Sequence, residues 1–342
     1  MMRSHFSIAL TLAVLVAACT TDETVQRPPP PPVNWSAQAR SSADAGPVKA
    51  TAKERAVAGA YTKALGSQGF AQLVALLDDD AHSEFAGAKD AHGRDNVVKA
   101  HDAMFGAFDQ RVFTPSRTWL TDSAQVVEWT MTGVQARDWE GVVATHKPVS
   151  FKGVSLLWTN DDGSIIDVYV LFDEAVVKVQ LGAGPKDLAN LQPAAAATAG
   201  DVVEQARTSE EAANVLQVRA SLTALEKGDE AGYLATMSDD VEVNVPERAQ
   251  PARGKDEARA YFKTLRKEIS EIDTSVDNAW GVKQFVIAEY FIVGEQQLPI
   301  GWVPVQSEKL IKLAVIDVVE MRGGKIARVW RYDDPAQILA TP

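Results

Sequence analysis

Hydrophobic positions along the chain follow helical spacing first and strand spacing afterwards, and this order occurs twice. The first half begins with apolar groups typical of two helices, Val57 with Tyr61 and then Leu73, Leu76 and Leu77. A third stripe at helical spacing follows at Val97, His101, Met104, Phe105 and Phe108. Beyond it the period changes to two, which predicts strands at 111–120, 125–133, 147–160 and 165–172. Helices followed by antiparallel strands indicate an α+β fold.

The second half repeats this pattern at a constant shift of 161 positions, for example from residue 93 to residue 254. Tryptophans and glycines, which are uncommon residues, fall on one another throughout this alignment. The aligned pairs include Gly93 and Gly254, Trp119 and Trp280, Glu128 and Glu289, and Gly163 and Gly324. The corresponding strands are expected at 274–280, 284–294, 310–321 and 325–332. The sequence therefore predicts two copies of one small domain, produced by duplication.

Two segments poor in core-forming residues divide the chain. Residues 19–50 include five consecutive prolines, which favour an extended polyproline II conformation, and residues 182–205 are rich in alanine and glycine. We interpret both as linkers. The predicted domains are then 51–181 and 206–342, each within the usual size range of one domain.

The first eighteen residues have the layout of an export signal. Arg3 and His5 precede an apolar run, Phe6–Ala18, that is short for a membrane span and ends at Cys19, the one cysteine in the chain. The preceding Leu-Val-Ala-Ala resembles the lipobox of bacterial lipoproteins. That resemblance implies lipidation of Cys19, a membrane anchor in the cell envelope and, since Thr20 replaces an inner-membrane retention aspartate, the outer membrane. An ordinary signal peptide with an incidental cysteine is the alternative.

Short motifs in both copies resemble the SnoaL-like branch of the NTF2-like superfamily. The first copy carries them at His92–Val97, Val127–Gly133 and Asp162–Ile165, and the second, more divergent copy at Arg253–Asp256 and Gly324–Ile326. The resemblance implies two cone-shaped domains, each with about three helices packed on a curved antiparallel sheet around a pocket. Polyketide cyclases, ketosteroid isomerases and non-catalytic domains share this scaffold, so the fold is specified more closely than the function.

Two glutamates in the middle of apolar strands are the candidate functional carboxylates. If Glu128 and the face of the last strand that bears Asp167 point into the cone, two carboxylates lie together in a low-dielectric site. One pKa then rises, and the pair can serve as a general acid and base. In the second copy the same geometry pairs Glu289 with Arg328 as an ion pair. Alternatively, Glu128 faces outward or pairs with Arg117 or Lys152.

Several large or polar side chains complete the candidate pockets. Tyr169 and Trp129 would shape the first pocket, and Trp139 offers a further apolar surface for a ligand. Trp330 holds the position of Tyr169 in the second copy. Asp173 ends the last strand at an acidic position common in the family, where capping of a turn is an equally good interpretation.

Other chemistry finds little support in the sequence. His101 lies on an apolar helical stripe and is interpreted as core. His82 and His92, aligned with Val243 and Arg253, lack a second histidine or cysteine at a usual ligand spacing, so no metal site is expected. No cofactor-binding motif is present, and none is expected to be needed. A net charge of −12 without a basic stripe argues against nucleic acid as a partner.

Two functions remain open from the sequence. The first is an envelope-anchored protein that binds a small apolar ligand, or another envelope component, in one or both cones. The alternative is an enzyme of the cyclase or isomerase type that uses Glu128 and Asp167, in a site shaped by Tyr169 or Trp129. Domains of this superfamily often pair through their sheets. We therefore expect an intrachain pseudo-dimer or a homo-oligomer.

Overall fold

The structure is a computed structural model. It describes residues 47–48, 50–85, 90–184, 188, 191, 193–246, 248–306 and 310–340. The predicted signal peptide, the lipidation site Cys19 and most of the first linker lie outside the described residues. Among the helices that are described, none has the length and apolar character needed to cross a membrane.

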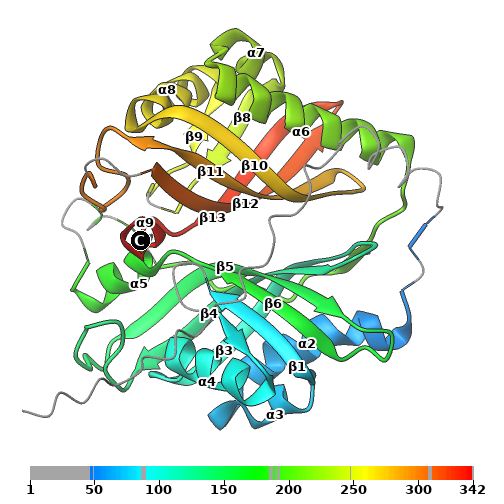
Figure 1. Cartoon of the computed structure of the whole chain (residues 1–342), viewed down its shortest axis with the longest axis vertical. Helices are drawn as coiled ribbons and strands as arrows, with labels where there is room; N and C mark the ends of the chain where they lie inside the picture. The colour runs from blue at the N-terminus through cyan, green and yellow to red at the C-terminus, as the bar shows by residue number, and fades with distance from the viewer. Residues whose placement is uncertain are drawn as a thin grey trace, which may run out of the picture. The chain divides into compact units, whose positions relative to one another are not determined.

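The first domain packs helices against one face of a seven-stranded sheet (Figure 1). Its helices are α2 (Ala52–Gly66), η1 (Gln68–Phe70), α3 (Ala71–Val74), α4 (Arg94–Phe105) and α5 (Glu174–Leu181). Its strands are β1 (Leu77–Phe85), β2 (Ala91–His92), β3 (Phe108–Leu120), β4 (Gln125–Gln135), β5 (Pro148–Thr159), β6 (Ile165–Leu171) and β7 (Val202–Glu204). They are arranged in the order β2-β1-β6-β5-β4-β3-β7. Helix α2 begins at a capping box, in which Thr51 and Glu54 satisfy each other's backbone N–H groups.

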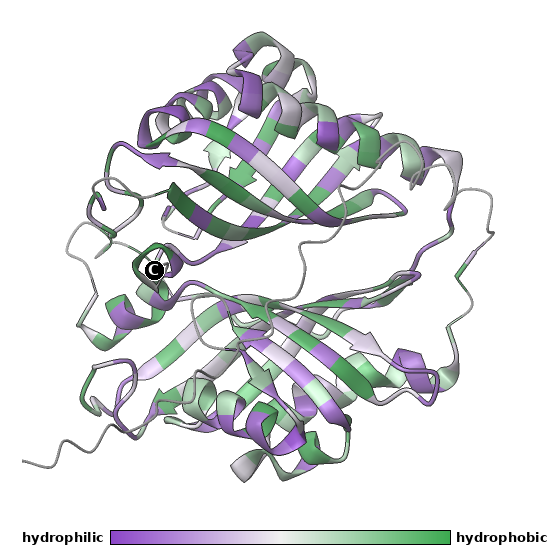
Figure 2. Cartoon of the chain, in the orientation of Figure 1, coloured by the Kyte–Doolittle hydropathy of each residue, from purple (hydrophilic) through white to green (hydrophobic). Residues whose placement is uncertain are grey.

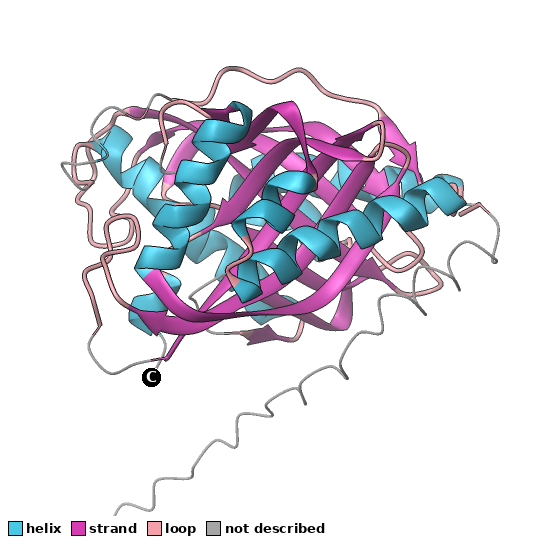
Figure 3. Cartoon of the chain, turned by 90° about the horizontal axis from the view of Figure 1, so that it is seen from above, coloured by secondary structure: helices cyan, strands magenta, loops and turns pink. Residues whose placement is uncertain are grey.

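The second domain repeats this architecture with six strands. Its helices are α6 (Ser209–Lys227), α7 (Glu230–Ala235), α8 (Gly254–Glu268) and α9 (Gln337–Ala340). Its strands are β8 (Met237–Asn244), β9 (Ala252–Arg253), β10 (Ile269–Val282), β11 (Phe285–Gln296), β12 (Leu310–Arg322) and β13 (Lys325–Asp333). They follow the order β10-β11-β12-β13-β8-β9. Thr208 and Glu211 form the same kind of capping box at the start of α6. In Figure 3 the helices lie across the strands.

The α+β prediction of two sheet-and-helix domains is confirmed, but four strands were predicted in each copy, and the structure adds β1, β2 and β7 to the first sheet and β8 and β9 to the second. Strands β1 and β8 pair in parallel with β6 and β13, so both sheets are mixed. Leu77, expected to end the second helix, instead opens β1. Strand β1 was not predicted because Asp79 and Asp80 are both exposed and interrupt the alternation of buried and exposed positions along it.

The two copies are not aligned at one constant shift. Glu128 lies opposite Val154 and Glu289 lies opposite Ile316, so the glutamates differ by 161 positions and their partners by 162. In the parallel pairs, His82 lies opposite Asp167, and Glu242 lies opposite Arg328. Asp167 and Arg328 differ by 161 positions, whereas His82 and Glu242 differ by 160. The structural counterpart of His82 is thus a glutamate and not Val243, which corrects the ungapped alignment.

Each sheet has two buried faces. The faces that carry helices form one core cluster in each domain, and both sheets contribute to a third cluster on their other faces. The alternation of green and purple along many strands in Figure 2 reflects strand periodicity. The third cluster includes Trp119, Val126, Leu156 and Tyr169 from the first sheet and Trp280, Ile316, Val318 and Tyr332 from the second. The two sheets therefore contact each other, and assembly beyond this chain stays a prediction.

Candidate functional site

Glu128 lies on the face of β4 that turns away from the helices. It is 1% exposed and accepts hydrogen bonds from Nε and Nη2 of Arg117, the latter at 2.6 Å. A third bond comes from the hydroxyl of Tyr332 in the second domain, also at 2.6 Å. This is the Arg117 pairing that the sequence left open, and it satisfies the buried charge.

The structure does not bring Glu128 and Asp167 together. Asp167 binds His82, with 2.8 Å between a carboxylate oxygen and Nδ1. On β6, the residue in register with Glu128 is Leu171, through Val154, and it is four positions from Asp167. At about 3.3 Å per residue, four positions separate the two carboxylates by roughly 13 Å along the strand direction. The acid and base pair proposed for the first domain is therefore not assembled.

Glu289 and Arg328 are separated in the same way. Burial raises the pKa of Glu289 to about 8, and its carboxylate accepts a hydrogen bond from Asn278 at 2.6 Å. Arg328 instead binds Glu320 at 3.1 Å and Glu242 at 3.4 Å. The expected ion pair is replaced by these contacts.

The strand faces also differ from the prediction, although this is not what separates the pairs. Asp167 was predicted to point into the cone, whereas Val168 and Val170 join the helix-side core and Tyr169 joins the cluster between the sheets. Glu128 and Asp167 therefore share the face away from the helices, and their offset along the strands keeps them apart. Because side chains alternate along a strand, an error of one residue moves every side chain to the opposite face.

The helix-side space of the first domain is filled by aromatic rings. Trp129 contacts four phenylalanines, with ring centroids 5.1 to 6.2 Å apart, at Phe105, Phe113, Phe151 and Phe172. All five side chains are at most 6% exposed. Among these described residues Trp129 is part of a packed core and does not line an open pocket.

The remaining predicted ligand-binding residues hold packing or capping positions in the structure. Trp139 donates its indole N–H to the carbonyl of Met104 at 2.7 Å. Asp173 is the N-cap of α5 and accepts from a backbone N–H at 2.7 Å. Tyr169 lies in the cluster between the sheets, where Trp330 also packs and receives the Arg117 guanidinium 3.8 Å above its ring.

An open cavity of about 410 Å³ lies in the second domain, on the helix side of its sheet. Its apolar wall includes Leu265 from α8, Ile292 from β11 and Leu313 from β12. Its polar lining consists of Tyr261, Thr264 and Glu268 from helix α8, Arg331 and Asp333 from β13, and Arg248 from the loop between β8 and β9. A volume of this size is within the range of small-molecule sites, which are mostly apolar with a few polar groups that orient the ligand.

A buried ion pair forms the polar side of this cavity. Arg331 donates from Nε and Nη2 to both carboxylate oxygens of Asp317, at 3.0 and 2.9 Å. Its Nη2 also reaches the hydroxyl of Tyr290 at 2.6 Å, and Nη1 donates to the hydroxyl of Tyr261. Burial alone would lower the pKa of Arg331, but the carboxylate and the phenols raise it well above its ordinary value. The guanidinium therefore stays charged and fixed in orientation.

Glu268 lies at the last residue of α8, beside the cavity. Burial, and secondarily the charge of Asp333, raises its pKa from the ordinary range to about 7. A carboxyl with this pKa exchanges its proton near neutral pH, which suits it to donate or accept a hydrogen bond or to transfer a proton.

The buried pair of Asp317 and Arg331 and its partner Tyr290 were not predicted from the sequence, because the first copy has no such residues to align with them. The positions of Tyr290, Asp317 and Arg331 are held in the first domain by Trp129, Ser155 and Val170. The available signal was an aspartate inside the apolar run Ala314–Val319, which needs a buried cation as partner.

The model of the SnoaL-like domain matches the chain twice, at residues 58–168 and 218–329. A search of curated protein sequences finds no match. A putative SnoaL-like polyketide cyclase from Jannaschia sp. CCS1 is 16% identical, with a TM-score of 0.35, over 40% of this chain and 100% of its own.

Two further solved structures are similar over one domain. A hypothetical protein with a ketosteroid isomerase-like fold from Catenulispora acidiphila, in complex with trimethylamine, is 13% identical over 36% of this chain and 89% of its own, with a TM-score of 0.32. An NTF2-like protein of unknown function from Burkholderia pseudomallei is 18% identical over 37% and 95%, also with a TM-score of 0.32. The two family-model matches together span more than half of the sequence, so the chain belongs to the SnoaL-like family and carries two of its domains in tandem.

Proposed function

We propose that the second domain binds a small, mostly apolar molecule that carries a hydrogen-bond acceptor. The observation that supports this most directly is the cavity of about 410 Å³ with an apolar wall and the Arg331 guanidinium at its side. Four donor contacts of Arg331 are made to described residues, and a guanidinium has five N–H groups. The fifth can serve an acceptor on the ligand.

The first domain has a supporting role in this proposal. Its aromatic core is packed, and its outer face contacts the second sheet through Tyr332 and Glu128. A buried hydrogen bond to a charged group contributes about 1.5–3 kcal/mol, which helps to hold the two sheets in register. The ligand site is thus assigned to one copy only.

The chain is further proposed to act at the cell envelope, anchored through a lipid on Cys19 and preferentially at the outer membrane. The support is the apolar run that ends in Leu-Val-Ala-Ala-Cys and the proline-rich spacer that follows. A spacer of extended polyproline conformation would hold the domains away from the bilayer. Globomycin sensitivity of processing, or mass spectrometry of the mature N-terminus, tests the lipidation.

The ligand proposal is tested by filling the cavity. Leu313→Trp adds volume at a cavity-lining position that is 2% exposed, whereas Leu310→Trp makes the same change on the same strand at a position that is 63% exposed. Native mass spectrometry of the full chain then searches for a co-purified molecule, and the fluorescence of 1-anilinonaphthalene-8-sulfonate reports binding. We expect the probe signal to fall for Leu313→Trp and to persist for Leu310→Trp. Equal binding by both variants contradicts the site.

Acid–base catalysis in the same cavity is a second candidate, supported by the pKa of Glu268 near 7 and by the neighbouring Asp333. This pair replaces the one that the sequence placed in the first domain. If a ligand co-purifies, the chain should catalyse exchange of an acidic proton of that ligand with D₂O, and Glu268→Gln should abolish the exchange while binding persists. Exchange at the wild-type rate in the variant would exclude Glu268 as the base.

A further inference from the structure

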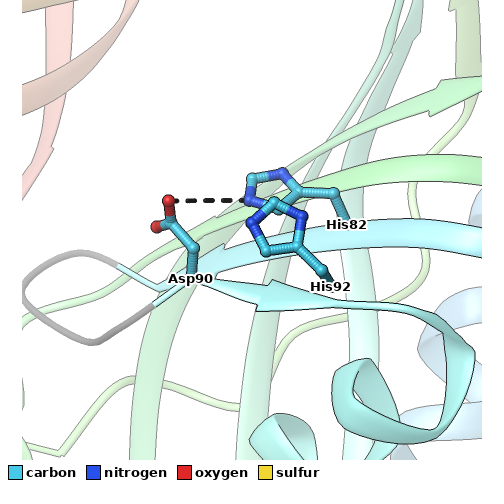
Figure 4. Close-up of side chains that lie close together, drawn as sticks. All are labelled: His82, Asp90 and His92. Carbon is cyan, nitrogen blue, oxygen red and sulfur yellow. Dashed lines mark ion pairs between the residues drawn. The ribbon is translucent and has the colours of Figure 1, made fainter. Parts of the chain in front are cut away.

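Two histidines and a carboxylate meet at one edge of the first sheet. His82 on β1 and His92 on β2 are directly opposite each other in the antiparallel pair, with ring centroids 4.6 Å apart. Asp90 immediately precedes β2, and its carboxylate lies 3.8 Å from Nε2 of His82 (Figure 4). One ligand atom from each of the three residues lies within 4.8 Å of the others. Sequence spacing alone did not predict this cluster, because it depends on strand pairing.

A second carboxylate fixes the orientation of His82. Asp167 is in register with His82 on the neighbouring strand β6, and its carboxylate lies 2.8 Å from Nδ1. With the proton on Nδ1, Nε2 carries the lone pair and lies beside the carboxylate of Asp90, while the His92 ring packs against the ring of His82. That Nε2 atom is buried and has no hydrogen-bond partner among the described residues. A carboxylate behind a histidine, with the other ring nitrogen free, is the usual outer-shell arrangement at metal sites.

The second domain has different side chains at the positions that correspond to His82, His92 and Asp167. There Glu242 lies opposite Arg253 and Arg328, and it contacts them at 3.6 and 3.4 Å. The two arginines and the glutamate form a salt-bridge ladder whose charges satisfy one another. In the first domain the arginine positions hold His92 and Asp167, so this strand edge carries side chains suited to bind a metal cation.

We propose that His82, His92 and Asp90 bind a divalent transition-metal ion of the zinc class. Two imidazoles and one carboxylate are ligands that zinc accepts, and a water molecule or an external anion would complete a tetrahedron. Ligand atoms in such a site are about 3.3 Å apart when the bonds are about 2.0–2.1 Å, so the side chains must approach slightly. Asp90 and His92 are exposed and can rotate to do so.

The test uses the full chain, purified in detergent, freed of metal with EDTA and titrated with zinc chloride by calorimetry. Variants His82→Gln and His92→Gln remove one ligand each, and Asp167→Asn removes the negative charge of the outer-shell carboxylate. His146→Ala, at an exposed histidine of the same domain, is the matched control. Circular dichroism and thermal unfolding establish that each variant is folded.

We expect one zinc ion per chain, with affinity at least tenfold weaker in each histidine variant and unchanged in His146→Ala. Asp167→Asn should weaken binding by about 10–100-fold, the usual effect of removing an outer-shell carboxylate. X-ray absorption of the zinc complex should show two imidazole ligands in the wild-type chain and one in His92→Gln. No stoichiometric binding, or binding that both histidine variants retain, would overturn the proposal.

Discussion

The ion pair between Asp317 and Arg331 gives the sharpest prediction about the second domain. The two side chains are 6% and 8% exposed and share two hydrogen bonds. Asp317→Asn keeps the shape of the side chain and removes its charge. The guanidinium would then remain buried without a countercharge, and its acceptors would be one amide oxygen and the phenols of Tyr261 and Tyr290.

The expected magnitude follows from this loss of a charged partner. Removing one member of a buried pair costs about 3–5 kcal/mol, because the remaining charge is uncompensated. With an m-value of about 2 kcal/mol per molar urea, the unfolding midpoint of the second domain should fall by roughly 2 M. Replacing both members, as Asp317→Leu with Arg331→Met, removes both charges and should cost less than Asp317→Asn alone.

Urea unfolding of the full chain, followed by tryptophan fluorescence and by circular dichroism, measures these differences. Asp317→Leu alone and Arg331→Met alone complete the double-mutant cycle with the wild-type chain and the double variant, and its coupling energy isolates the pair. A cycle in which the double substitution costs as much as the sum of the single ones would show that the charges are not coupled. A single-variant cost below about 1 kcal/mol would show that water reaches the pair.

Three further substitutions test the packing and the charges described above. Gly153→Ala should destabilise the first domain by about 1–3 kcal/mol in thermal unfolding, because a Cβ atom there would lie 2.3 Å from the ring of Trp129. Arg117→Met should cost about 3 kcal/mol in urea unfolding, since it leaves the Glu128 carboxylate buried without its cation. Because the folded-state pKa of Glu268 is raised to about 7, the folded state binds this proton more tightly, and stability falls as pH rises from about 4.5 to 7. In Glu268→Gln the free energy of unfolding should depend less on pH. If urea unfolding between pH 5 and 8 gives the same pH dependence for both proteins, this carboxyl is not buried as described.

Much of the fold could be predicted from the sequence because the signals are local. Strand β4 was expected at 125–133 and spans Gln125–Gln135, and β13 was expected at 325–332 and spans Lys325–Asp333. Period-two alternation and the flanking glycines were sufficient for both strands. The short strands β2 and β9 have no such signal, because two residues cannot show a period.

The candidate site could not be predicted because it depends on which face of each strand meets the helices. Local alternation says that Asp167 and Tyr169 share a face, but it does not say which one. That choice is set by the pairing of β6 with β1 and by the bulge between Trp158 and Thr159, both of which are long-range features. The same information places His82 beside His92.

The difference between the two domains follows from a few positions on the helix side of the sheets. Where the first domain has Phe113, Phe151 and Phe172, the second has Thr274, Leu313 and Asp333. Each replacement removes a ring from the interior.

The volume released by these changes lies beside Arg331, and the chain does not refill it with apolar side chains. Instead the chain carries the buried ion pair of Asp317 and Arg331. Replacing such a pair by well-packed apolar residues often leaves protein stability unchanged or raises it. Retaining a fixed guanidinium beside an open apolar wall is therefore hard to explain by stability, whereas recognition of an acceptor group on a ligand accounts for both the hollow and the charge. Under the proposed function, duplication separated two roles, with the first copy as a packed partner and the second carrying the ligand site.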